Sequence, residues 1–147
     1  AAKICMNSGS HMFLANGKKN YPISNMIKNN KFTHFFPKVS SLDAKKKWII
    51  GSLSSNGTIK IDDGASKALK NGKSLLAAGV TRIDGIFNKG ENVLILDQYN
   101  NQLARGLSSF SSEEINKIKG KQSKEIEKIL GYLSKTEIIH KDDMVLL

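Results

Sequence analysis

The stretch from residue 57 to residue 72 reads GTIKIDDGASKALKNG. Polar and apolar residues alternate over residues 58–61, which is typical of a half-buried strand. Asp62 or Asp63 can cap a helix that follows, and Asn71 with Gly72 can end it. Ala65, Ala68 and Leu69 would share one face of this helix. This one short helix lies among several strand candidates, which favours a mainly β domain with short helices.

Further strand candidates follow at short intervals. They cover residues 80–83, 86–87, 93–97 and 102–108, and glycine or asparagine residues separate them. Several short strands with turn residues between them are typical of small closed sheets. We therefore expect a small barrel, with Trp48, Phe87 and Phe110 in its core.

Two helices are predicted after these strands. Ser111 and Glu114 have the spacing of a capping box, so a helix should begin there. We expect Ser123 to cap a second helix that ends at Gly131. The buried stripe of this second helix should consist of Ile126, Ile129 and Leu130. A final strand over residues 144–147 should pair back into the barrel.

The first 40 residues show a different pattern of predicted helices and strands. They predict a helix at 2–8, a strand at 11–15, a helix at 22–28 and a strand at 32–36, stopped by Pro37. These pieces resemble part of an α/β unit and cannot bury their apolar faces alone. A connecting helix over residues 42–47 leads into WIIG at 48–51. We place a domain boundary near residue 40, with units 1–40 and 41–147.

The positive charge is concentrated in the first third of the chain. The formal net charge is +10 and the isoelectric point is near 9.7, which is typical of proteins with polyanionic partners. Residues 1–50 hold nine Lys and one acid, whereas residues 51–147 hold fourteen Lys or Arg against twelve Asp or Glu. The second part is therefore almost neutral, which disfavours an extensive nucleic-acid surface there.

The sequence contains few groups for metal binding or disulfide formation. The single Cys5 and the scattered His11, His34 and His140 do not form a spaced zinc motif. No apolar run approaches the roughly 20 residues of a membrane span. We expect a cytoplasmic protein without membrane contact and without a metal site.

Three motifs have structural interpretations. Gly72-Lys73-Ser74 ends like a P-loop, but Lys67 stands where that motif requires glycine, so we interpret Gly72 as the end of a helix. Asp62-Asp63 is interpreted as a helix cap and Asp142-Asp143 as a solvated turn, because adjacent carboxylates diverge. His140 has no nucleophile or acid at a diagnostic spacing, so no catalytic residue is assigned.

Residues 45–147 resemble the PUA domain of bacterial glutamate 5-kinases. The resemblance is carried by KWIIGSL at 47–53, GTIKIDDGA at 57–65, GKSLLAAGV at 72–80, ARGL at 104–107, SKEIEKILGY at 123–132 and HKDDMV at 140–145. Residues 1–17 and 33–37 are similar to the end of the amino-acid kinase domain that precedes it. The resemblance implies a PUA-like pseudo-barrel preceded by a truncated α/β tail.

The resemblance also implies a function. The family transfers the γ-phosphoryl group of ATP, with magnesium, to L-glutamate and so opens proline biosynthesis. The family's phosphate-binding and glutamate-binding motifs have no counterpart here, so we expect this chain alone to be inactive and to bind no cofactor. Its expected partners are the kinase domain of the parent chain and further copies of the parent.

An RNA-binding PUA module is the alternative. PUA domains bind RNA in pseudouridine synthases and transglycosylases. If this chain does so, the densest basic group of the domain is the best candidate surface. That group comprises Lys67, Lys70, Lys73, Gly79 and Arg82.

Overall fold

The computed structural model describes residues 1–18, 20–29, 31–51, 55–132 and 135–147. The chain divides into two compact units, Ala1–Lys45 and Lys46–Leu147. The sequence placed a boundary near residue 40, and the division in the structure falls five residues later, inside helix α3 (Ser41–Gly51).

The first unit is a hairpin with two helices. It contains α1 (Ala2–Asn7), β1 (Met12–Leu14), α2 (Pro22–Asn29) and β2 (Thr33–Phe35), all close to their predicted positions. Strands β1 and β2 pair antiparallel, with Phe13 opposite His34. None of the described residues of this unit is buried. The described part of this unit therefore has no hydrophobic core of its own, in agreement with the sequence prediction.

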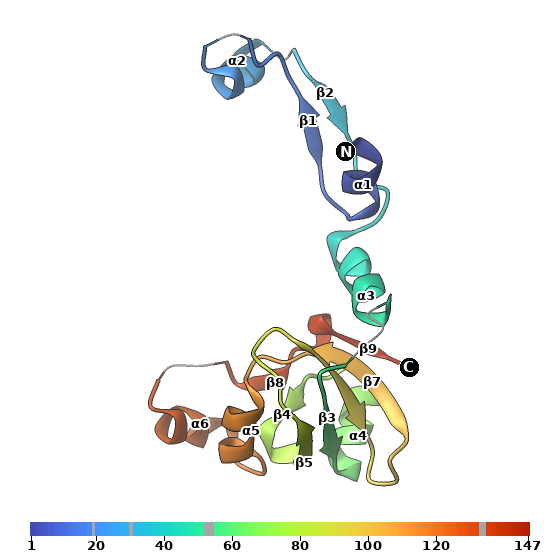
Figure 1. Cartoon of the computed structure of the whole chain (residues 1–147), viewed down its shortest axis with the longest axis vertical. Coiled ribbons are helices and arrows are strands. Elements are labelled where there is room, and N and C mark those ends of the chain that lie inside the picture. The colour runs from blue at the N-terminus through green and yellow to red at the C-terminus, as the bar shows by residue number, and fades with distance from the viewer. Residues whose placement is uncertain (19, 30, 52–54, 133–134) are drawn as a thin grey trace. The chain divides into compact units, whose positions relative to one another are not determined.

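The second unit consists of two sheets with short helices (Figure 1). A five-stranded mixed sheet has the order β5-β3-β6-β7-β9, in which only β3 and β6 run parallel. A second, two-stranded sheet pairs β4 with β8. The strands are β3 (Gly57–Ile61), β4 (Leu75–Leu76), β5 (Val80–Gly85), β6 (Asn92–Leu96), β7 (Gln102–Leu107), β8 (Glu137–Ile139) and β9 (Met144–Leu146). The expected β-rich class with short helices is confirmed.

Short helices complete this unit. They are α4 (Asp63–Lys70), α5 (Ser112–Ile118) and α6 (Ser123–Leu130), with 3₁₀ turns η1 (Ala77–Gly79) and η2 (Lys141–Asp143). Asp62 caps α4 by accepting a hydrogen bond from the Ala65 amide at 2.7 Å. Gly72, in the left-handed region at φ 71°, lies just beyond the end of α4. The cap and the helix-ending glycine are both confirmed.

One continuous core joins both sheets. Ile59 and Ile95 of the large sheet, Leu75 and Ile139 of the small sheet, and Leu69 of α4 belong to the same buried cluster. Helices α5 and α6 add Ile115, Ile118 and Ile126 to it. The burial of these residues is the main stabilising contribution to the fold.

Several local predictions were wrong. Residues 86 and 87 form no strand: Ile86 is 89% exposed, whereas Phe87 is buried in the core. Trp48 is 59% exposed and so is no core residue, although Phe87 and Phe110 are buried as expected. Gln122, not Ser123, caps α6, because its side chain and that of Glu125 form the capping box.

Two further differences concern α6 and the small sheet. Ile129 is 38% exposed, so the buried stripe of α6 reduces to Ile126 with partly buried Leu130. Strands β4 and β8 were not predicted. Each is too short to show periodicity, and together they join segments about sixty residues apart.

None of the helices in the described part of the chain combines the length and apolar composition that a bilayer crossing requires.

The capping box of α5 extends to a third side chain. The Ser111 hydroxyl accepts from the Glu114 amide, Glu114 accepts from the Ser111 amide at 2.8 Å, and Tyr132 donates its hydroxyl to the other Glu114 oxygen. Partial burial raises the pKa of Glu114, but the hydrogen bonds from Tyr132 and Ser111 outweigh it, so the pKa lies below its usual value. The hydrogen bond to Glu114 raises the pKa of Tyr132.

We expect Tyr132→Phe to lower the free energy of unfolding by at most about 1 kcal/mol, because Tyr132 is exposed and solvent screens its bond to the half-buried Glu114. This loss of unfolding free energy should be greatest at pH values between the pKa of Glu114 and the pKa of Tyr132. A lowered carboxyl pKa contributes stability that disappears as the pH falls through it, and a raised phenol pKa contributes stability that disappears as the pH rises through it. Denaturant unfolding across the pH range measures this. A pH-independent difference would contradict the assignment.

Candidate functional site

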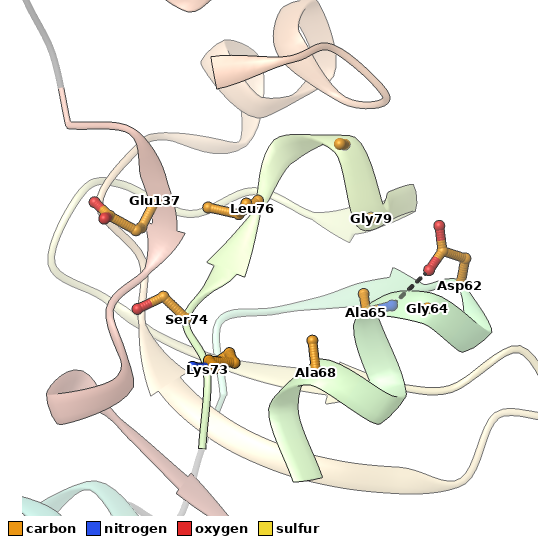
Figure 2. Close-up of a pocket in the computed structure, with 10 residues that line it drawn as sticks. Asp62, Gly64, Ala65, Ala68, Lys73, Ser74, Leu76, Gly79 and Glu137 are labelled. Atoms are coloured by element: carbon orange, nitrogen blue, oxygen red, sulfur yellow. Dashed lines mark hydrogen bonds between the residues drawn. The ribbon is translucent and has the colours of Figure 1, made fainter. Parts of the chain in front are cut away.

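A cavity lies between α4, the segment formed by β4 and η1, and strand β8 (Figure 2). Its volume is about 580 Å³. The elements around it come from three separate stretches of sequence, near residues 62–68, 73–79 and 137. We call it the α4–η1 cavity.

The apolar floor of the cavity is a face of α4. Ala65 and Ala68 lie three positions apart and therefore on the same side of the helix. Figure 2 shows both side chains pointing toward the segment that carries Leu76 and Gly79. Small alanine side chains leave the space open, and Leu76 adds an aliphatic wall.

Close packing explains the glycine at position 79. The Gly79 carbonyl accepts a hydrogen bond from the Asp62 amide at 3.0 Å, which holds η1 against the beginning of α4. A Cβ atom at residue 79 would lie 2.4 Å from the Cβ of Ala65. The two segments can approach this closely only because residue 79 has no side chain.

Polar groups lie at the two ends of the cavity. Figure 2 shows Asp62 at one end and Lys73, Ser74 and Glu137 at the other. The Asp62 carboxylate is already engaged in capping α4, while the Ser74 hydroxyl accepts from the Lys141 amide at 3.0 Å. Glu137 is in register with Leu76 across the two-stranded sheet.

This arrangement suits binding better than catalysis. An apolar floor with polar groups at both ends can hold a small group that has one flat or aliphatic face. Among the described lining residues, no nucleophile is paired with a general base. Within the described residues, no group of three or more His, Cys, Asp or Glu side chains is placed to hold a metal ion.

The five residues proposed from sequence for RNA contact do not form one site. Lys73 and Gly79 line the cavity, whereas Lys67 and Lys70 are exposed on α4 and do not line it. Arg82, on β5, forms an exposed ion pair with Asp84 at 2.8 Å. The structure therefore brings two of the five together.

Lys70 lies close enough to Asp97 to affect it. The side-chain hydrogen bond from Asn101 is the main cause of a lowered pKa of Asp97, and the positive charge of Lys70 adds to it. An acidic neighbour weakens the attraction of Lys70 for a phosphate. The basic group near α4 is therefore less electropositive than its composition indicates.

Sequence reasoning missed Leu76 and Glu137 as cavity residues. Both face the cavity because β4 pairs with β8, and that pairing has no local signal in either short segment. Asp62 was identified from its capping position, but its place at the mouth of a cavity was not.

The comparisons with known proteins agree with one another. The model of the PUA domain matches residues 57–130. The chain is 61% identical over 145 residues to a glutamate 5-kinase of Pelagibacter ubique, covering 99% of this chain and 39% of the relative. It is 42% identical over 146 residues to a glutamate 5-kinase of Rhodopseudomonas palustris, with the same coverage. The chain thus spans about two fifths of the length of these curated relatives, 39% in both cases.

Solved structures were matched as well. A crystal structure of a PUA domain from Aeropyrum pernix K1, in a tartrate complex, is 21% identical and covers 58% of this chain and 41% of its own, with a TM-score of 0.44.

Proposed function

This chain belongs to the PUA domain family, and we propose that it acts as the regulatory and structural C-terminal part of a glutamate 5-kinase. The observation that carries the proposal is the 61% identity to such a kinase over 99% of the chain. The parent enzyme would transfer the γ-phosphoryl group of ATP to L-glutamate, forming L-glutamyl 5-phosphate in proline biosynthesis.

Cofactor binding and regulation would belong to different domains of the parent enzyme. ATP and magnesium would bind in the kinase domain of the parent, because phosphoryl transfer needs positioned cations and backbone amides around the phosphates. The PUA unit would contact that domain and influence its regulation. A cytoplasmic location and an oligomeric parent complete the proposal.

We expect the 147-residue chain to show no glutamate-dependent ATP hydrolysis above background. Loss of the groups that surround the phosphates removes nearly all transition-state stabilisation. A coupled ADP assay measures this, and activity that co-purifies with the chain would contradict it. A longer parent with and without residues 46–147 provides the second measurement. Retained turnover with altered feedback inhibition supports a regulatory unit, and identical kinetics would contradict it.

RNA binding is the second candidate function. It is supported by the exposed lysines of α4 and by Lys73 beside an open cavity. Against it stands the charge of the PUA unit, because residues 51–147 have a surplus of only two positive charges. Arg82 is also paired with an acid.

We expect that binding of a generic tRNA at low salt depends mainly on residues 1–50, which carry nine of the lysines and one acid. Each neutralised phosphate contributes roughly 0.7–0.9 to the slope of log affinity against log salt, so a shortened chain starting at Lys46 should show a weak and shallow dependence. Filter binding at several salt concentrations measures the slope for the whole chain and the slope for the shortened chain. If the shortened chain binds one RNA tightly near physiological salt, and Lys70→Ala with Lys73→Ala abolishes that binding, RNA recognition replaces the regulatory proposal.

A further inference from the structure

The hairpin of the first unit presents an aromatic face that contains two histidines. Because side chains alternate along a strand, residues 11 and 13 share a face with residues 32, 34 and 36 of the paired strand segment. These residues are His11, Phe13, Phe32, His34 and Phe36. Sequence spacing alone made the histidines look unrelated, since 23 positions separate His11 from His34.

The two imidazoles meet edge to edge. His11 Nδ1 lies 2.9 Å from His34 Nε2. The His34 ring stacks on Phe13, with ring centroids 4.1 Å apart and an interplanar angle of 18°. The Phe36 ring also lies against His34, and the centroids of these two rings are 3.9 Å apart. Two phenyl rings therefore restrict the orientation of His34 before any ligand binds.

We propose that His11 and His34 form a two-imidazole chelating site for a late divalent transition-metal ion, with Cu²⁺ or Ni²⁺ as the ions of best fit. The ion would replace the hydrogen bond between the two neutral rings, and the proton in that bond would move to the other nitrogen of its own ring. Each ring would keep one proton on its other nitrogen, which leaves His11 Nδ1 and His34 Nε2 free to donate lone pairs.

The distance between the nitrogens favours a particular geometry. Imidazole nitrogens bind such ions at about 2.0–2.1 Å, so two ligands at a right angle stand about 2.9 Å apart and two at the tetrahedral angle about 3.4 Å apart. The observed 2.9 Å, the length of the hydrogen bond between the rings, equals the separation of two ligands at a right angle. Square-planar or octahedral coordination is typical of Cu²⁺ and Ni²⁺, whereas Zn²⁺ prefers the tetrahedral arrangement.

The composition of the site excludes cations that require oxygen ligands. Both ligands are imidazoles, and no third His, Cys, Asp or Glu among the described residues completes a cluster with them. Water would fill the remaining positions, since both sides of the pair lie at an exposed hairpin face. Mg²⁺ and Ca²⁺ require oxygen ligands and should not bind.

The test uses the 147-residue chain with CuSO₄ as the probe. We expect one bound Cu²⁺ whose electron paramagnetic resonance spectrum shows coupling to two imidazole nitrogens. His11→Asn and His34→Asn should each weaken binding by about tenfold or more and leave coupling to one imidazole. His140→Asn, which alters the third histidine in the other unit, is the matched control and should change neither quantity.

Specific outcomes would overturn the proposal. Unchanged affinity in His11→Asn would mean that Cu²⁺ binds elsewhere, for example at the amino terminus. Equal loss in His140→Asn would also contradict the site. To separate lost ligation from an altered hairpin, the amide resonances of Met12 and Phe35, which are paired across the strands, are compared among the metal-free variants. Selective broadening of His11, His34 and Phe13 signals by Ni²⁺ in the unaltered chain provides an independent test.

Discussion

Phe87→Ala is expected to lower the free energy of unfolding by about 3–5 kcal/mol, because truncating a buried phenyl ring loses its burial and leaves a cavity. Phe87 is 1% exposed and belongs to the core cluster that joins both sheets. A Cβ on Gly57 would lie 2.5 Å from the Phe87 ring, so the ring packs directly on the β3 backbone. The Phe87 carbonyl also accepts from the Ser112 amide at 2.9 Å, which ties it to the start of α5.

The neighbouring residue supplies the matched control. Ile86 is 89% exposed, so Ile86→Ala should change the free energy of unfolding by no more than about 0.5 kcal/mol. Guanidinium unfolding followed by circular dichroism measures both variants. The transition reports the second unit, because the described residues of the first unit have no buried core. Equal effects at positions 86 and 87 would refute the placement of Phe87 in the core.

Gly79→Ala is expected to cost about 1–3 kcal/mol by forcing η1 away from α4. The added Cβ would lie 2.4 Å from the Cβ of Ala65. The same movement would stretch the hydrogen bond from the Asp62 amide to the Gly79 carbonyl, now 3.0 Å long.

A double-mutant cycle tests the cause. Ala65→Gly alone should cost about 0.5–1 kcal/mol through the lower helix propensity of glycine. Without the Ala65 side chain, the nearest atom to the new Cβ is the Ala65 Cα at 3.6 Å, an ordinary contact. The double variant should therefore be more stable than the sum of the two single effects predicts, by about 0.5–3 kcal/mol.

Gly51→Ala is the control for the substitution itself. A Cβ at position 51 meets nothing within 4 Å, so this change should be neutral or stabilising by up to about 1 kcal/mol. Strict additivity of Gly79→Ala and Ala65→Gly would show that close packing between η1 and α4 is not the reason for the glycine.

Interactions between residues close in sequence made much of the fold predictable. The capping position of Asp62, the capping box of Ser111 with Glu114, and the helix-ending glycines at 72 and 131 all depend on residues within one turn of each other. Alternation over residues 58–61 likewise predicted strand β3, and short runs between glycine and asparagine residues predicted strands β6 and β7. Such signals are readable because the interacting groups are close in sequence.

The candidate sites depend on contacts between distant segments. The α4–η1 cavity exists because β4 pairs with β8, and because Gly79 lies against Ala65. The basic residues selected from composition separate in space, and Arg82 is paired with Asp84. Spacing along the chain could not predict which lysines would share a surface.

The sequence by itself therefore determined most of the element types and their ends, the near-neutral charge of the second unit and the resemblance to the PUA family. Only the tertiary structure decided that Trp48 is exposed while Phe87 is buried, and that His11 and His34 lie 2.9 Å apart. Caps and periodicity arise from neighbouring residues. Burial and side-chain clustering depend on which strands pair, and strand pairing depends on packing throughout the core.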